Sequence, residues 1–570
     1  MRLSALIIAI ALVGPAWPSE TTRRNFIDTF IFDKMRDNGV SPAPLSADSE
    51  FLRRVYFDLT GRLPTPDAAK KFLADTDPDK RDKLIDSLFP KLPTPGIGRR
   101  PPSRPFLDRW TYFFCDLFRV NVELSKEGIA AFREHIYKAL EINYPYDQFV
   151  RDLLTADAMS TWTNGPANFL ARERVMENEG FSKMNHEDTC DEQAIWSTKL
   201  FLGVNTECIS CHDGQGHLDK INLWLSTRKR ADVWRQAAFF DKTSVTAVFG
   251  RVAEFQVRDI DKGYDLTTRS FIRLPRYAAE VHPTFILNGE RFEPQKGESQ
   301  RVAYARLVTS NPQFARAAVN MIWAELMGRG IVDPPFDFDL ARQDPKTPPP
   351  APWKIQPTHP ELLDALADDF RKNNFDLQRV MKLIVKSRAY QLSSYYPGQW
   401  QPAYEDYFAR RIVKRLPAEQ LWDAASQAAG VFEVFPSSKA KYLLQTNYSQ
   451  EYENSHKNLF NLLKDFGQTS REDLPNDRSS MVQVAQLLNS PLFKALVKVR
   501  PGSRLEGLLK AQPRKSDEEI VTELFFAAIS RPPTPEEMRV AIAPLRQNRE
   551  QGAEDLLWAL INRMDFVFNL

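Results

Sequence analysis

THPELLDALADDF, residues 358–370, contains the pattern that decides the fold class. Thr358 and Glu361 have the spacing of a helix capping box, and the leucines that follow recur at helical intervals. Asp376 precedes a second run of the same kind, LQRVMKLIV at 377–385. The pattern therefore predicts two consecutive helices that form a helical hairpin.

Two further stretches, VYFDLTGRLPTP (55–66) and LFFAAISRPPTP (524–535), share one arrangement. Each is the apolar end of a helix, then a small residue, an arginine and proline. Each then has a threonine that can cap a new helix, a proline at the first helical position and an acid in the first turn. We predict that both are helix-turn-helix joints, and nothing beyond the joint repeats.

These signals extend along most of the chain, so we expect a mainly α protein. Residues 22–242 read as an N-terminal helical domain and residues 298–570 as a C-terminal helical domain. Between them, 243–297 contains short β-branched and aromatic runs split by Gly, Asp and Pro: VTAVFGRVAEFQV (245–257), FIRL (271–274) and TFIL (284–287). We predict a small β insertion there.

The first 19 residues have the composition of a secretory signal peptide, with one arginine, an apolar run from Leu3 to Val13 and small residues around Ala16. That run is too short to span a bilayer, and no later run reaches spanning length. Hydrophobic residues at 43% and charged residues at 26% are typical of a water-soluble protein, and the net charge of +2 gives no reason to expect nucleic acid as a partner. We expect export to the periplasm, with no transmembrane segment after cleavage.

The segment CISCHDGQGHLDK, from Cys208 to Lys220, carries the chemistry. In Cys-x-x-Cys-His two thiols are spaced to bond the two vinyl groups of one porphyrin, and the next imidazole can bind the iron. With four cysteines and seven histidines in 570 residues, chance is a poor explanation of this pattern. We expect haem c bound covalently through Cys208 and Cys211, with His212 as the proximal iron ligand.

Two other interpretations of the cysteines stay open. Cys208 and Cys211 could bind zinc together with His217 and either Cys190 or His212, or they could form a plain disulfide or redox pair. Cys115 and Cys190 could form a disulfide, which the sequence alone does not decide.

The sixth position of the haem iron needs a ligand from outside the motif, unless it is open to small molecules. His217 lies only five residues past His212, so it would have to cross to the opposite face of the ring. The better-separated candidates are Met184, His186, Met159 and His282. Ahead of the motif, Asp188, Asp191 and Glu192 form an acidic cluster, which we expect to stabilise the first turn of a helix through its dipole.

The chain resembles a planctomycete-type, cytochrome-associated pair of domains of unknown function. FLRRVYFDLTGRLPTPDAAKKFLAD (51–75) and TKLFLGVNTECISCHD (198–213) resemble the N-terminal domain, domain of unknown function 1549. RVAYARLVTSNPQFARAAVNMIWAELMGRGIVDPPFDF (301–338) and THPELLDALADDF resemble the C-terminal one, domain of unknown function 1553. The resemblance implies exported, cytochrome-related proteins whose reactions are mostly unassigned. Many relatives continue the motif as Cys-His-Asp-His-Pro, whereas this chain has Gly214 after Asp213.

Together these observations predict an exported single-haem c-type cytochrome-like protein. It would act in periplasmic electron transfer, or in haem-dependent oxidoreduction of a substrate that the sequence does not identify, with a periplasmic redox protein as its partner. The alternative is a zinc- or disulfide-stabilised binding or scaffold module without catalysis. No Ser-His-Asp order, phosphate-binding loop or H-E-x-x-H motif occurs, so the sequence assigns no catalytic residue.

Overall fold

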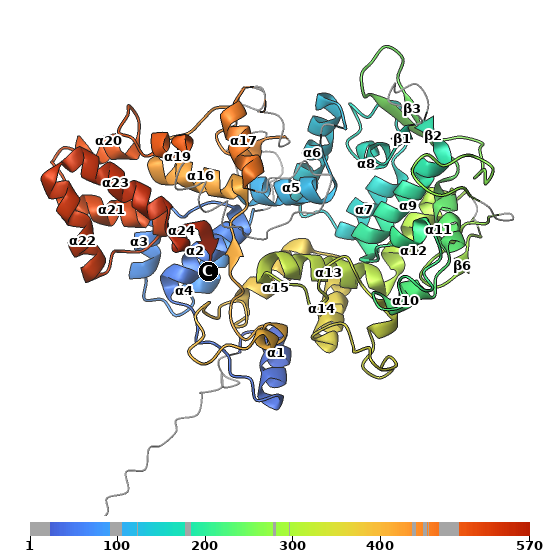
Figure 1. The fold of residues 1–570 in the computed structure, drawn as a ribbon, viewed down its shortest axis with the longest axis horizontal. Helices are drawn as coiled ribbons and strands as arrows, with labels where there is room; N and C mark the ends of the chain where they lie inside the picture. Colours follow the sequence, from blue (N-terminus) through green and yellow to red (C-terminus); the bar gives the residue numbers. More distant parts are fainter. Residues whose placement is uncertain are drawn as a thin grey trace, which may run out of the picture.

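The computed structural model of the chain describes residues 23–91, 105–121, 123–176, 184–276, 281–293, 295, 297–435, 440–447, 453, 455–466 and 490–570. The predicted signal peptide, 1–19, lies outside these residues. The fold is mainly α, as predicted (Figure 1).

The helices of the first half are α1 (Phe26–Asp37), α2 (Asp48–Thr60), α3 (Pro66–Ala74), α4 (Lys80–Leu88), α5 (Pro105–Leu117), α6 (Lys126–Glu141), α7 (Tyr146–Thr155), α8 (Ala167–Arg172), α9 (His186–Leu202), α10 (Leu223–Ser226) and α11 (Arg230–Ala237). Those of the second half are α12 (Gln300–Ser310), α13 (Pro312–Met327), α14 (Pro360–Lys372), α15 (Leu377–Lys386), α16 (Ala418–Ala429), α17 (Lys457–Asp465), α19 (Pro491–Leu496), α20 (Arg504–Leu509), α21 (Asp517–Ile529), α22 (Pro535–Gln547), α23 (Arg549–Ile561) and α24 (Met564–Val567).

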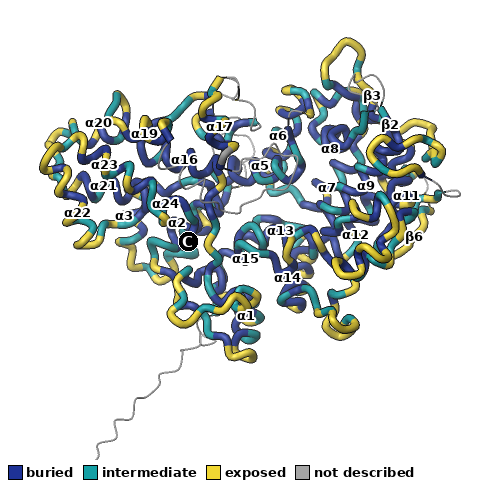
Figure 2. Tube along the Cα trace, viewed as in Figure 1, coloured by how far each residue is buried: buried dark blue, intermediate teal, exposed yellow. Residues whose placement is uncertain are grey.

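The buried apolar side chains form two large clusters. The first takes in the helices from α1 to α15, and the second takes in α16 to α24 together with Phe57 and Leu63. Figure 1 shows the same division, with α16–α24 beside α2–α4 on one side and α7–α12 on the other, and Figure 2 shows dark, buried backbone inside both groups. The boundary between the clusters falls near residue 412, so helices α12–α15 share a cluster with the N-terminal part of the chain, and Phe526 of α21 also belongs to it.

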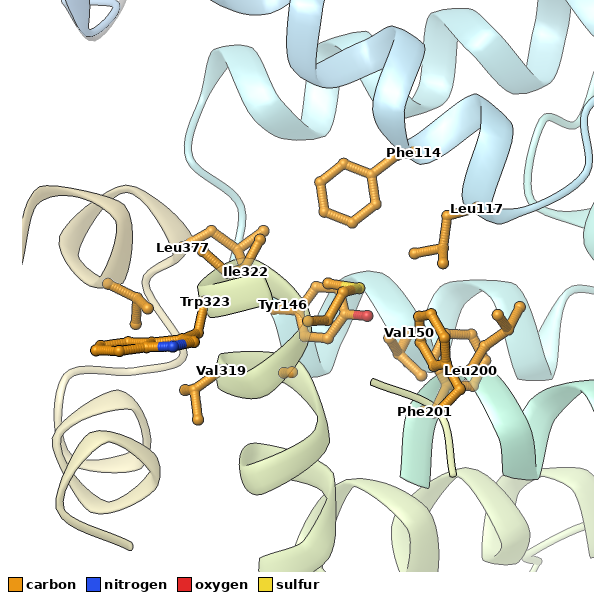
Figure 3. Packing of buried hydrophobic residues seen from close by; sticks show 14 of the residues in the cluster. Phe114, Leu117, Tyr146, Val150, Leu200, Phe201, Val319, Ile322, Trp323 and Leu377 are labelled. Atoms are coloured by element: carbon orange, nitrogen blue, oxygen red, sulfur yellow. The ribbon is translucent and has the colours of Figure 1, made fainter. Parts of the chain in front are cut away.

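The first cluster is centred on helices that are far apart in the sequence. Figure 3 shows side chains of α5, α7, α9, α13 and α15 directed into one core, among them Phe114, Tyr146, Phe201 and Trp323. Tyr146 stacks on Phe314 with ring centroids 5.5 Å apart. Because α9 belongs to the first predicted domain and α13 to the second, this core joins the two.

The predicted hairpin at 358–385 is confirmed as α14 and α15, but its predicted capping box is wrong. The N-cap residue of α14 is His359, and its side chain accepts no capping hydrogen bond. Thr358 is used elsewhere: its backbone N–H and its hydroxyl both donate to the carbonyl oxygen of Ile331, at 2.9 and 3.3 Å. A contact with a distant segment therefore replaces the local cap.

Both predicted joints are confirmed. The side chains of Thr65 and Thr534 cap α3 and α22, and each of these helices has proline at its first position. The preceding helices, α2 and α21, end in left-handed residues, Gly61 with φ of 65° and Ser530 with φ of 60°. The joints thus share one backbone shape, and in the second a serine occupies the position that favours glycine.

The β structure consists of short antiparallel pairs. Two pairs lie in the predicted insertion: β3 (Thr243–Ala247) with β4 (Phe255–Asp259), and β5 (Thr284–Phe285) with β6 (Glu290–Arg291). Two other pairs lie outside it: β1 (Val175–Met176) with β2 (Met184–Asn185), and β7 (Lys414–Arg415) with β8 (Phe568–Asn569). FIRL, 271–274, is not a strand. The N–H of Phe271 donates to the Asp188 carboxylate instead of to a neighbouring strand, at 2.8 Å.

Candidate cofactor-attachment site and adjoining cavity

The Cys-x-x-Cys-His motif lies on a loop between α9 and α10. Residues 208–210 form one 3₁₀ turn, Cys208 and His212 are exposed and Cys211 is half-buried. Both thiols are free. Partial burial raises the pKa of Cys208 above the ordinary thiol value, and the nearby carboxylates of Glu207 and Asp337 act in the same direction. Both thiols and the imidazole are therefore within reach of a group that attaches from outside.

Two arginines fix the shape of this turn through Ser210. Arg230 donates from Nε to the Ser210 carbonyl oxygen at 2.9 Å, and Arg273 donates from Nε to the Ser210 hydroxyl at 2.8 Å. The Asp213 carboxylate accepts the backbone N–H of Arg230 at 2.9 Å, which holds the other side of the motif. Asp213 thus has a structural role.

The acidic cluster on α9 has a different role from the predicted one. The N-cap of α9 is Asn185, and Asp188 and Asp191 both pair with Arg276, whose side chain is fully buried. Glu192 pairs with Arg273 in the same way. Asp188 does lie in the first helical turn, but the main contacts of the cluster are ion pairs to Arg273 and Arg276. Arg273 is also the residue that bonds the Ser210 hydroxyl.

The predicted sixth ligands lie on different elements of the chain. His186 is buried, and its Nε2 lies 2.7 Å from the carbonyl oxygen of Asp241. Met184 belongs to β2 and is paired with Met176, while Met159 and His282 are exposed. The ring that packs against His212 is that of His217, edge-on, with centroids 4.0 Å apart. His217 therefore lies beside the proximal position, as its short separation in sequence suggested.

The zinc and disulfide alternatives find limited support. Cys190 is buried and its thiol donates to the carbonyl oxygen of Phe240 at 3.3 Å, and Cys115 and Cys190 do not form a disulfide with each other. Across the residues that the structure describes, no group of three or more His, Cys, Asp or Glu side chains is arranged to hold a metal ion. A zinc site built on His212 and His217 would need the loop to rearrange.

Apolar side chains are exposed around the motif. Ile221 is 70% exposed, Ile272 49% and Leu274 53%. The last two flank Arg273, and the Leu274 carbonyl oxygen accepts a hydrogen bond from the same Arg230 that binds Ser210. Two thiols and an adjacent imidazole are the groups that would attach and ligate a haem c, and exposed apolar side chains beside them could contact a porphyrin, so the residues present fit this cofactor.

The structure also accounts for Gly214. A Cβ atom at this position would lie 2.0 Å from the carbonyl oxygen of Leu225, in α10. The Gly214 N–H donates to the backbone carbonyl oxygen of Arg228 at 2.9 Å, and this bond keeps the two backbone segments in contact. A side chain at position 214 would therefore collide with α10, and the imidazole that lies beside His212 is that of His217.

A segment of the second predicted domain holds both ends of the motif loop. The N–H of Phe338 donates to the Gly203 carbonyl oxygen at 2.9 Å, just before the motif. The Asp339 carboxylate accepts the N–H groups of Leu223 and Trp224 at 2.7 and 2.9 Å, just after it. The roles of Arg230, Arg273 and Asp339 are not predictable from local sequence patterns, because each residue acts on residues distant in the chain. The DPPFDF motif that precedes Asp339 is the one sequence signal near any of them.

A cavity of about 600 Å³ adjoins this loop. It is lined by residues from α2, α5, α9, α13 and α16 and by the strand pair of β7 and β8. Lys199, Asn205 and Asp337 belong to its wall, and Lys199 and Asp337 also act electrostatically on the thiol of Cys208. Burial raises the pKa of Asp337. The loop that carries the motif thus contributes Asn205 to the wall of a cavity that segments of both predicted domains line.

Comparison with known proteins supports the organisation read from the sequence. Residues 26–244 match the family model described as protein of unknown function (DUF1549), and residues 300–545 match the one described as protein of unknown function (DUF1553). No curated protein and no solved structure matches the chain. None of the described helices has the length and apolar character needed to cross a bilayer. The chain therefore belongs to these two families, with a DUF1549 domain followed by a DUF1553 domain in one polypeptide.

Proposed function

We propose that the protein is an exported, single-haem c-type cytochrome-like protein that acts in periplasmic electron transfer or in haem-dependent oxidoreduction. Cys208 and Cys211 would hold the porphyrin, and His212 would bind the iron. The observation that carries the proposal is the accessible Cys-x-x-Cys-His turn, with its exposed apolar border of Ile221, Ile272 and Leu274.

When bound, the haem would supply one-electron chemistry at its iron. The residues of the chain would hold the haem in place. Arg230 and Arg273 keep the Ser210 turn in one conformation, so the two thiols and the imidazole stay on one exposed surface. A periplasmic redox protein would exchange electrons at this exposed surface.

The test is a reduced-minus-oxidised visible spectrum of the full-length protein, produced together with haem-attachment machinery. We expect a sharp α-band, and haem that remains on the chain in denaturing gels. Cys208→Ala and Cys211→Ala should each weaken covalent attachment, and His212→Ala should change the spectrum of the iron. Cys115→Ala is the matched control, because that thiol is buried away from the motif. A colourless wild-type protein would refute the proposal.

The second candidate is a zinc-stabilised binding module. One observation favours it: His217 lies against His212, so two thiols and two imidazoles occur within ten residues. Colourless protein that contains one zinc per chain, and loses it in His217→Ala, would support this candidate. Haem attachment that is unaffected by His217→Ala would argue against it.

A further inference from the structure

We propose that the cavity between α5, α13 and α16 is a binding site for an uncharged, polyhydroxylated molecule, a neutral saccharide. The inference does not depend on what the Cys-x-x-Cys-His motif carries. It is built on the volume of the cavity, the pairing of the charges in its wall, its apolar surfaces and its position between the two domains.

The volume is that of a ligand site. At about 600 Å³ the cavity lies inside the range of roughly 300–1,000 Å³ that small-molecule sites occupy. Its wall includes Phe57 and Asp58 of α2, Tyr112 of α5 and Glu325 of α13. These segments belong to both families, so the complete cavity exists only when the two domains are together.

The charges in the wall neutralise one another. Among the described lining residues five are basic and six are acidic. Glu325 pairs with Arg109 and lies 3.8 Å from Lys414, which in turn lies 3.8 Å from Asp58. A wall with almost no net charge gives little electrostatic attraction to an anion or a cation.

The wall also contains hydrogen-bonding groups that a neutral ligand can share. The Tyr112 hydroxyl donates to Glu419 at 2.7 Å, and Asn569 donates to Asp58 at 2.8 Å. Carboxylates accept and guanidinium or ammonium groups donate, so alternating partners match hydroxyl groups, which do both. Hydroxyl groups bound to charged partners form the stronger class of hydrogen bond.

The remaining wall is apolar. Phe113, Leu117, Met321 and Phe336 line the cavity together with the two prolines that precede Phe336. A saccharide has hydroxyl groups at its edges and C–H groups on its faces, so it can use the polar pairs and the apolar wall at once. A purely apolar ligand would leave the ion pairs without solvent and without new partners.

Isothermal titration calorimetry with the full-length protein tests the inference. The probes are neutral saccharides of one to three units built from glucose, galactose, mannose and xylose, with trigalacturonate and tetraethylammonium as the anionic and cationic comparisons. We expect at least one neutral saccharide to bind, and both charged probes to bind about tenfold more weakly or not at all. The measurement is repeated with Cys208→Ala/Cys211→Ala, where binding should be unchanged. Loss of the haem spectrum and loss of saccharide binding are therefore separate results.

Ala324→Trp fills the cavity from α13 and should weaken saccharide binding about tenfold or more. Asn205→Trp is a second blocking variant from the other end of the cavity, for use if the first does not fold. Ala543→Trp, on an exposed part of α22, is the matched control and should bind as the wild type does. Failure of every neutral saccharide to bind, stronger binding of a charged probe, or equal binding by folded blocking variants would each overturn the inference.

Discussion

Replacement of Gly214 by alanine should destabilise the motif loop locally. The added Cβ would lie 2.0 Å from the Leu225 carbonyl oxygen, 2.9 Å from the Leu225 carbonyl carbon and 3.0 Å from Cα of Ser226. These are backbone atoms, so no side-chain rotation relieves the contact, and the two segments have to separate by about 1 Å. Overpacking of this kind costs about 1–3 kcal/mol.

Separation of the segments also weakens the hydrogen bond from the Gly214 N–H to the Arg228 carbonyl oxygen. A hydrogen bond of this kind contributes about 1 kcal/mol to stability. Alanine restricts the unfolded chain and regains about 0.4–1 kcal/mol. The net loss is about 2–3 kcal/mol in the free energy of local opening. Gly214→His, which would recreate the motif of the relatives, should cost at least as much.

Amide hydrogen exchange followed by mass spectrometry measures this loss where it occurs. Peptides that cover residues 208–230 should exchange about 30–150-fold faster in Gly214→Ala, since each 1.4 kcal/mol corresponds to a factor of ten. Gly263→Ala is the matched control, because no atom lies within 4 Å of its added Cβ and its φ is not in the left-handed region. If the two variants exchange alike in this segment, the steric explanation of the Gly214 departure is wrong.

Three more substitutions test the packing. His359 is buried, and burial lowers its pKa from 6.5 to about 3, so below pH 6.5 the unfolded chain binds a proton at this residue and the folded chain does not. About 2 kcal/mol of stability should therefore be lost between pH 7 and pH 5. His359→Leu should flatten that part of a pH profile of the free energy of unfolding in urea. Arg276→Met leaves the buried carboxylates of Asp188 and Asp191 without their cation and should cost about 3–5 kcal/mol in urea unfolding. Ser530→Gly removes a left-handed serine whose buried hydroxyl has no partner among the described residues, and should raise the unfolding midpoint by an amount equivalent to about 1 kcal/mol.

The helix ends that the sequence predicted correctly are those that depend on neighbours in the chain. Thr65 and Thr534 cap helices that begin one residue later, and the proline and acid that follow are part of the same turn. Thr358 has an equally good local pattern but bonds Ile331 instead. A local rule fails there because the competing partner is 27 residues away, and nothing in the local pattern reports it.

The candidate site also has a part that the local sequence predicts and a part that it does not. The sequence by itself determined that Cys208, Cys211 and His212 form one chemical unit, because their spacing is a property of adjacent residues. Only the tertiary structure decided what holds that unit. Arg273 bonds Ser210, inside the motif, from 63 residues away, and Asp339 bonds Leu223, after the motif, from 116 residues away.

The cavity was likewise absent from the sequence reading. Its wall joins α2, α5, α13 and α16, which meet only after the chain has packed into its two hydrophobic clusters. Hydrophobic burial is non-directional, so the sequence reveals which residues are buried more readily than which buried faces meet. The local geometry of turns and motifs was therefore readable in advance, and the partners that the motif meets were not.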